Sequence, residues 1–209
     1  VREDVDNLKA ALSGVKHVEG FMSAASPGVV SLFFRNDHYK DFETYIYAIA
    51  DAMRDEYETV ANAGFVLQFD CPDLGMGRHI QYADLDLKEF RKRITIHIEA
   101  LNYALRDLPP EKLRLHLCWG NYEGPHHFDV ALADIIDLVF NARPSMISFE
   151  TSQMISNETS GFSRENSEMA SCRKATAKSV GKPMRIVPST LRPLSFETAS
   201  SLIWRSCRA

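Results

Sequence analysis

The chain has 209 residues, 45% hydrophobic and 25% charged, which is the ordinary range for one globular domain with its own core. The formal net charge of −4 gives no electrostatic reason to expect a nucleic-acid partner, because such proteins concentrate Lys and Arg on one face. No segment approaches the roughly eighteen apolar residues that cross a bilayer, and no signal-peptide pattern is present, so we expect a cytoplasmic protein without a membrane partner.

The expected elements alternate between helix and short apolar strand. The helices are expected at residues 2–13, 42–63, 87–105 and 132–141, and the strands at residues 18–25, 65–70, 113–119 and 146–150. Ser26-Pro27-Gly28 and Cys71-Pro72-Asp73 are expected to end the first two strands. This alternation predicts parallel βα units of an α/β fold, either a barrel or a doubly wound sheet.

The composition of the chain changes after residue 150. Residues 1–150 hold every His, Tyr and Asp and carry a formal charge of −9, whereas residues 151–209 hold 12 Ser, nine basic and four acidic residues. Apolar residues in 151–209 follow neither helical nor strand spacing, so we predict a Ser-rich basic tail that is disordered over most of its length. An out-of-frame or mis-spliced tail is the alternative, which sequencing of gene and transcript across codon 150 would test.

Three successive expected strands end in a residue that can ionise, namely Asp70, Cys118 and Glu150. The carboxyl ends of parallel strands form the working face of α/β folds, so these side chains should converge. His116 and Cys118 are two residues apart, and on a strand they point to the same side. Imidazole, thiolate and carboxylate together suit Zn²⁺ better than Mg²⁺ or Ca²⁺. The alternative is that these are ordinary strand residues and helix caps, since an isolated His-x-Cys pair is a weak motif.

Three segments resemble consecutive strands of the catalytic domain of cobalamin-independent methionine synthase. They occur in the family's chain order, within residues 18–152, and read FVLQFD-x-P (65–72), LHLCWGNY (115–122) and MISFETS (146–152). The resemblance implies an incomplete TIM-type (β/α)8 barrel over residues 1–150. It implies zinc ligands at His116, Cys118 and Glu150, and a contact of Asp70 with the amino group of homocysteine.

The resemblance also implies a reaction, the transfer of a methyl group from methyl-tetrahydrofolate to homocysteine or another thiol in methionine biosynthesis. A thiol of pKa about 8.5 is mostly protonated at neutral pH, and zinc coordination deprotonates it and makes it a nucleophile. Ser26 falls where the family has a short Gly-Pro turn on the substrate side. Arg78 is suited to a substrate carboxylate.

Histidines near the expected active face are candidate proton donors. His126 and His127 lie in a Gly/Pro loop and are candidate catalytic acids or substrate contacts. His79 is expected to line the same pocket, whereas His97, within an expected helix, is expected to be structural.

The sequence departs from the family pattern in three places. It begins at what resembles the helix before the third strand, and no segment resembles the last strand, which carries the fourth zinc ligand; Cys172 and Cys207 are not at the end of an expected strand. The loop WGNYEGPHH (119–127) indicates a methionine-synthase-like branch rather than a methionine synthase proper. An inactive fragment, truncated at both ends, and a porphyrin-decarboxylase-like barrel, which needs no His-x-Cys pair, are the alternatives.

Overall fold

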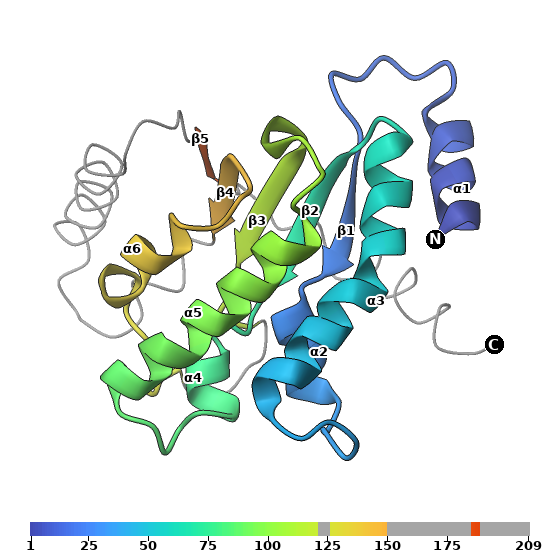
Figure 1. Cartoon of the computed structure of the whole chain (residues 1–209). Coiled ribbons are helices and arrows are strands. Elements are labelled where there is room, and N and C mark those ends of the chain that lie inside the picture. Colours follow the sequence, from blue (N-terminus) through green and yellow to red (C-terminus); the bar gives the residue numbers. More distant parts are fainter. Residues whose placement is uncertain (121–125, 150–184, 189–209) are drawn as a thin grey trace, which may run out of the picture.

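The computed structural model describes residues 1–120, 126–149 and 185–188. Within them five parallel strands form one sheet in the order β1-β2-β3-β4-β5 (Figure 1). The strands are β1 (Phe21–Ala25), β2 (Val66–Cys71), β3 (Leu113–Leu117), β4 (Met146–Phe149) and β5 (Arg185–Pro188). The predicted α/β fold with parallel strands is confirmed, and the arrangement is that of a partial TIM-type barrel.

Apart from the N-terminal helix, which stands at one edge beside the helix Phe42–Asn62, the helices connect successive strands and cover one face of the sheet (Figure 1). They are α1 (Arg2–Leu12), α2 (Pro27–Phe33), α3 (Phe42–Asn62), α4 (Gly77–Ile80), α5 (Leu87–Ala104) and α6 (Ile136–Val139), with single 3₁₀ turns η1 (Pro110–Lys112) and η2 (Leu132–Asp134). Asp41 and Asp86 begin the two long helices, because each carboxylate accepts a hydrogen bond from the backbone N–H three residues later.

Several element boundaries differ from those expected. Ser26 does not merely end β1: its hydroxyl caps α2, a helix that the sequence reading missed, and Pro27 occupies the first helical position. The expected helix at 132–141 is two short pieces, η2 and α6, and α4 was not expected. The strand Arg185–Pro188 pairs with β4 inside the segment predicted to be a disordered tail; the other residues of 151–209 lie outside the described part.

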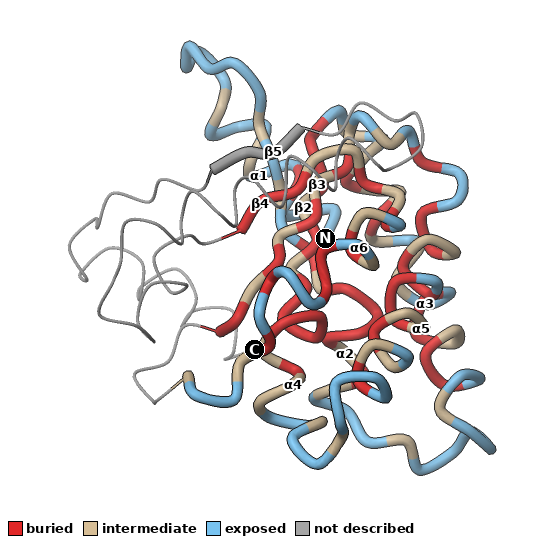
Figure 2. Tube along the Cα trace, turned by 90° about the vertical axis from the view of Figure 1, so that its left-hand side faces the viewer, coloured by how far each residue is buried: buried red, intermediate tan, exposed pale blue. Residues whose placement is uncertain are grey.

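Side chains alternate between the two faces of the central strands. Leu67, Phe69 and Leu115 are buried, together with Leu113, Leu117 and Ile147. Figure 2 shows buried stretches along the central strands and along the helices. The opposite face carries polar positions at matching registers, with Gln68 beside Arg114 and Asp70 beside His116. A parallel sheet buried on both faces reads as a continuous apolar run, so this alternation marks one polar face.

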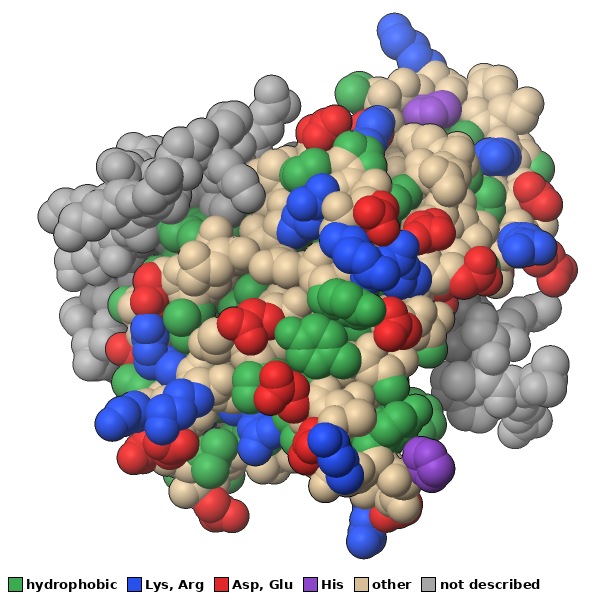
Figure 3. Space-filling view, in the orientation of Figure 1, with side chains coloured by type: hydrophobic (Ala, Val, Ile, Leu, Met, Phe, Trp, Pro, Cys, Tyr) green, Lys and Arg blue, Asp and Glu red, His purple; other side chains and the backbone are tan. Residues whose placement is uncertain are grey.

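None of the helices in the described ranges is long and apolar enough to span a bilayer. Over the helix-covered side of the molecule, acidic and basic side chains are interspersed (Figure 3).

Candidate metal centre

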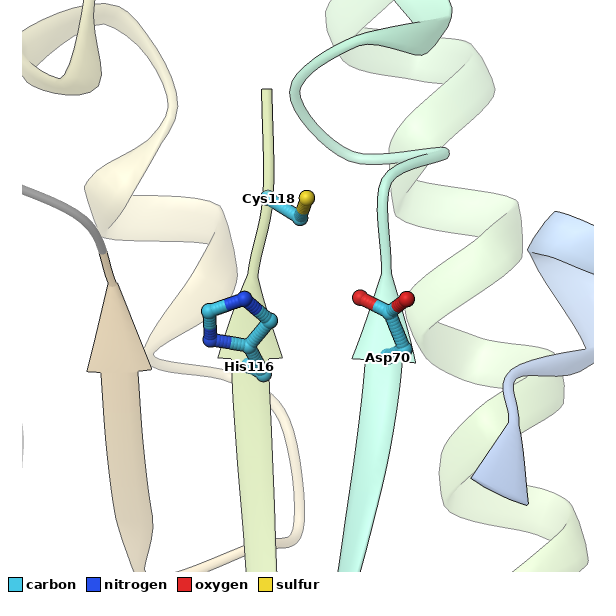
Figure 4. Close-up of side chains that lie close together, drawn as sticks. All are labelled: Asp70, His116 and Cys118. Atoms are coloured by element: carbon cyan, nitrogen blue, oxygen red, sulfur yellow. The ribbon is translucent and has the colours of Figure 1, made fainter. Parts of the chain in front are cut away.

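Asp70, His116 and Cys118 form a group at the carboxyl ends of β2 and β3 (Figure 4). One ligand atom from each side chain, a carboxylate oxygen, an imidazole nitrogen and the thiol sulfur, lies within 4.8 Å of the others. Asp70 and His116 are direct register partners, and Cys118 follows β3 by one residue on the same side. The predicted convergence of these three residues is therefore found.

The backbone around Cys118 is held by its neighbours. The carbonyl of Cys118 accepts a hydrogen bond from the N–H of Met76 at 3.2 Å, and the N–H of Gly120 points at the Cys118 sulfur at 3.3 Å. Cys118 is partly exposed, so a ligand can reach it.

The donor set fits zinc. An imidazole nitrogen and a thiolate sulfur, from His116 and Cys118, suit Zn²⁺, whereas Mg²⁺ and Ca²⁺ take oxygen ligands. Among the residues that the structure describes, Asp70, His116 and Cys118 are the only group of three or more His, Cys, Asp or Glu side chains close enough together to hold a metal ion. Glu150, the third predicted ligand, lies outside the described residues, as do Cys172 and Cys207.

The other cysteine near the group behaves differently. Cys71 ends β2 with its side chain turned into the core, where it is 1% exposed. Burial raises the pKa of the Cys71 thiol well above its usual range, and the nearby carboxylates of Asp73 and Asp70 raise it further. Cys71 therefore remains a neutral thiol, and of the two described cysteines Cys118 is suited to a metal.

A buried polar network lies next to the centre and was missed in the sequence reading. Asp73 accepts a hydrogen bond from the hydroxyl of Ser26 at 2.8 Å, and its other oxygen lies 2.9 Å from Nδ1 of His97. The hydroxyl of Tyr82 lies 3.3 Å from Nε2 of the same imidazole. The carboxylate stands between Ser26 and His97, so the imidazole is not placed to take the serine proton and the three residues are not a hydrolytic triad.

The remaining predicted site residues are placed as follows. Nδ1 of His126 lies 2.8 Å from a carboxylate oxygen of Asp129, and both side chains are mostly buried. The ring of His127 contacts that of Phe128 at an interplanar angle of 48°, and its centroid lies 6.1 Å from that of His79.

Two predicted substrate contacts are engaged within the protein. Arg78 donates to the carbonyls of Tyr82 and Ala83, which fixes the turn after α4. The Ser26 hydroxyl is buried against Asp73 rather than turned to solvent. Direct contacts of Arg78 and Ser26 with a substrate stay predictions.

No family model and no curated protein sequence matches the chain. Among solved structures, the fold is similar to that of a B12-independent methionine synthase from Shewanella sp. W3-18-1, in complex with selenomethionine, with a TM-score of 0.53 and 18% sequence identity. The match covers 71% of this chain and 41% of the synthase chain, so this chain spans well under half of its length. At this identity the similarity establishes the fold, a partial TIM-type barrel.

Proposed function

We propose that this chain carries the metal centre of a zinc-dependent enzyme that transfers a methyl group to a thiol, such as homocysteine, in methionine biosynthesis. The observation that carries the proposal is the convergence of Asp70, His116 and Cys118 at the carboxyl edge of the sheet. A methionine synthase among the proteins of similar fold supports the choice of reaction. We expect the reaction to take place in the cytoplasm.

In this proposal His116 and Cys118 hold the zinc ion, with Glu150 as a further ligand. Bound zinc would deprotonate the substrate thiol and so supply a nucleophile at neutral pH. In the sequence, Glu150 follows Ser148 by two residues, as Cys118 follows His116, and Ser148 is the register partner of His116. This spacing supports Glu150 as the ligand contributed after β4.

Asp70 is proposed to bind the amino group of the substrate. Its carboxylate would pair with an ammonium group, a charge-assisted hydrogen bond that also orients the substrate. Because Asp70 is the register partner of His116, an amine bound there would bring the rest of a short amino thiol close to the metal ligands.

His126 is proposed as the acid that protonates the nitrogen from which the methyl group leaves. Methyl-tetrahydrofolate, the proposed donor, has a poor nitrogen leaving group until that nitrogen is protonated. The contact with Asp129 engages Nδ1 and orients the ring, so Nε2 is the atom proposed to donate the proton. His127 is the alternative acid, and Arg78 is proposed to bind a substrate carboxylate.

An assay of methionine formation tests this function. The purified full chain, loaded with Zn²⁺, is mixed with methyl-tetrahydrofolate and homocysteine, and methionine is measured against a sample treated with a chelator. We expect turnover that needs zinc and that falls at least about a hundredfold in Cys118→Ser, because the substitution removes a metal ligand. Cys71→Ala, which removes the buried thiol, should keep most of the activity.

Zinc-independent turnover, or full activity in Cys118→Ser, would contradict the proposal. Because the chain spans 41% of the synthase, a metal-binding fragment without turnover is the second candidate. In that case the zinc-loaded chain binds metal through His116 and Cys118 but forms no methionine, whereas a longer protein carrying the remaining barrel strands is active.

A further inference from the structure

The buried network around Asp73 lies at the carboxyl end of the sheet, because Asp73 follows β2 by two residues and Ser26, its hydrogen-bond partner, follows β1 and caps α2. Asp73 and His97 are each 1% exposed, and Ser26 is 2% exposed. A carboxylate this deeply buried is costly unless its oxygens are bonded, and here both are. The space is also tight, since a Cβ atom on Gly28 would stand 1.9 Å from an Asp73 oxygen.

One branch of the network reaches Asp70. The backbone N–H of Ser26 donates to the carbonyl of Asp70 at 3.3 Å, while the hydroxyl of the same serine donates to Asp73. The Ser26 hydroxyl also accepts from the N–H of Val29, so Ser26 is fixed from three sides. The position of Asp73 therefore helps to set the main chain of Asp70.

The other branch reaches Cys118. The loop after β2 folds on itself, because the N–H groups of Leu74 and Gly75 donate to the carbonyls of Cys71 and Pro72. The next residue, Met76, donates to the carbonyl of Cys118 at 3.2 Å. Gly75 lies so close that a Cβ atom on it would be 2.6 Å from that same carbonyl oxygen.

We propose that Asp73 is a positioning residue for the metal centre. Anchored by Ser26 and His97, it locks the loop that begins at Asp70 and that supports the backbone of Cys118, and so fixes the separation of these two side chains. The proposal rests on the proposed function, since it concerns the same centre. Residues behind metal ligands typically change metal affinity by about 10–100-fold when they are replaced.

The test compares Asp73→Ala and Asp73→Asn with Leu105→Ala, in the full chain. Leu105 is fully buried at the end of α5 that is remote from the centre, so its truncation lowers stability without touching the loop. Two quantities are measured: hydrogen exchange of the Met76 amide in the metal-free chain, and the dissociation constant and visible absorption spectrum of bound Co²⁺. Exchange rates are compared after correction for the global stability of each variant.

We expect Asp73→Ala to accelerate exchange of the Met76 amide at least about tenfold relative to Leu105→Ala and to weaken Co²⁺ binding about 10–100-fold, with an altered cobalt spectrum. Asp73→Asn keeps the shape and an acceptor oxygen for the Ser26 hydroxyl, but it places an NH2 donor against Nδ1 of His97, so it should recover part of the exchange protection and part of the Co²⁺ affinity. If Asp73→Ala matches Leu105→Ala in exchange and affinity, the proposal is wrong.

The two readouts separate this proposal from the proposed function. If the parent chain binds no Co²⁺, the proposed function fails, while Met76 exchange still decides whether Asp73 locks the loop. If Asp73→Ala does not fold, Ser26→Ala is tested in its place. This substitution removes the hydrogen bond between the Ser26 hydroxyl and Asp73, through which Asp73 is linked to the main chain of Asp70. Parent-like exchange and affinity in Ser26→Ala would then overturn the proposal.

Discussion

Gly75 is the residue at which the loop after β2 comes closest to the metal centre. Its backbone angles do not require glycine, because its φ is not positive, so the constraint there is steric. A Cβ atom would meet the Cys118 carbonyl at 2.6 Å and the Trp119 ring at 3.2 Å. Gly75→Ala should therefore displace Cys118 and weaken Zn²⁺ binding by roughly tenfold.

Competition with a chromophoric chelator measures this effect, with Gly77→Ala as the matched control. A Cβ atom on Gly77 meets nothing closer than 3.7 Å, so that variant should bind zinc as the parent does. Equal affinities in the two alanine variants would show that the contact at Gly75 does not hold Cys118 in place.

The residues of the site differ in how far sequence predicts them. Asp70, His116 and Cys118 were predictable, because the carboxyl ends of successive parallel strands must share one edge. Asp73 and His97 were not, since their pairing joins residues 24 apart and depends on how α5 packs against the loop. The available signal is the acidic residue directly after Cys71-Pro72, a pattern that by itself predicts only the end of a strand.

Among the elements, α5 and α6 are joined by an ion pair whose strength depends on pH. The guanidinium of Arg91 donates to both carboxylate oxygens of Asp137, at 2.8 and 2.6 Å. This bonding holds the pKa of Asp137 below its usual range, although partial burial opposes it. The folded chain thus keeps Asp137 ionised at a pH where the unfolded chain already protonates it.

The direction in which stability changes with pH follows from that order of pKa values. The stabilisation is fully present above the unfolded pKa, about 3.9, and is lost as the pH falls through the lower folded pKa. Because both side chains are partly exposed, at 32% and 58%, it amounts to less than about 1 kcal/mol. Asp137→Asn should lower the free energy of unfolding at pH 6, and by less near pH 2, which lies below the unfolded pKa.

Urea denaturation at the two pH values measures this dependence, with Asp6→Asn on the exposed face of α1 as the control. A stability difference for Asp137→Asn that is the same at pH 6 and pH 2 would show that the ion pair is not its source.

Element boundaries show where local patterns were ambiguous. Ser26-Pro27-Gly28 was read as a strand stop, but Ser followed by Pro is equally a helix start, and the short α2 that follows lacks the length for a clear apolar period. The long helices α3 and α5 were predicted within one residue at each end, because many turns repeat the same spacing.

At the scale of the whole molecule, β1 lies at an edge of the sheet. Among the described strands only β2 pairs with it. A cleft of about 460 Å³ beside it is lined by Phe33 and Phe34 and also by the carboxylates of Glu56 and Asp70. These two rings are 69% and 66% exposed. Unpaired edges next to exposed apolar rings favour association with further strands, so we expect this chain to self-associate as its concentration rises.

Sedimentation over a concentration series checks that expectation. Phe33→Lys places a charge beside the β1 edge and should reduce association. Phe128 is also exposed, at 57%, but does not line the cleft beside β1, so Phe128→Lys should leave association unchanged. Equal association in the parent and in Phe33→Lys would exclude the β1 edge as the contact.

His116 and Cys118, at the carboxyl edge of this sheet, are the proposed zinc ligands. The most direct measurement is the zinc content of the purified full chain after metal loading and dialysis, compared with His116→Ala, Cys118→Ser and the buried-thiol control Cys71→Ala. We expect about one zinc ion per chain in the parent and in Cys71→Ala, and a loss of bound zinc in the two ligand variants. A parent chain without zinc, or zinc that stays bound in both ligand variants, would contradict the account.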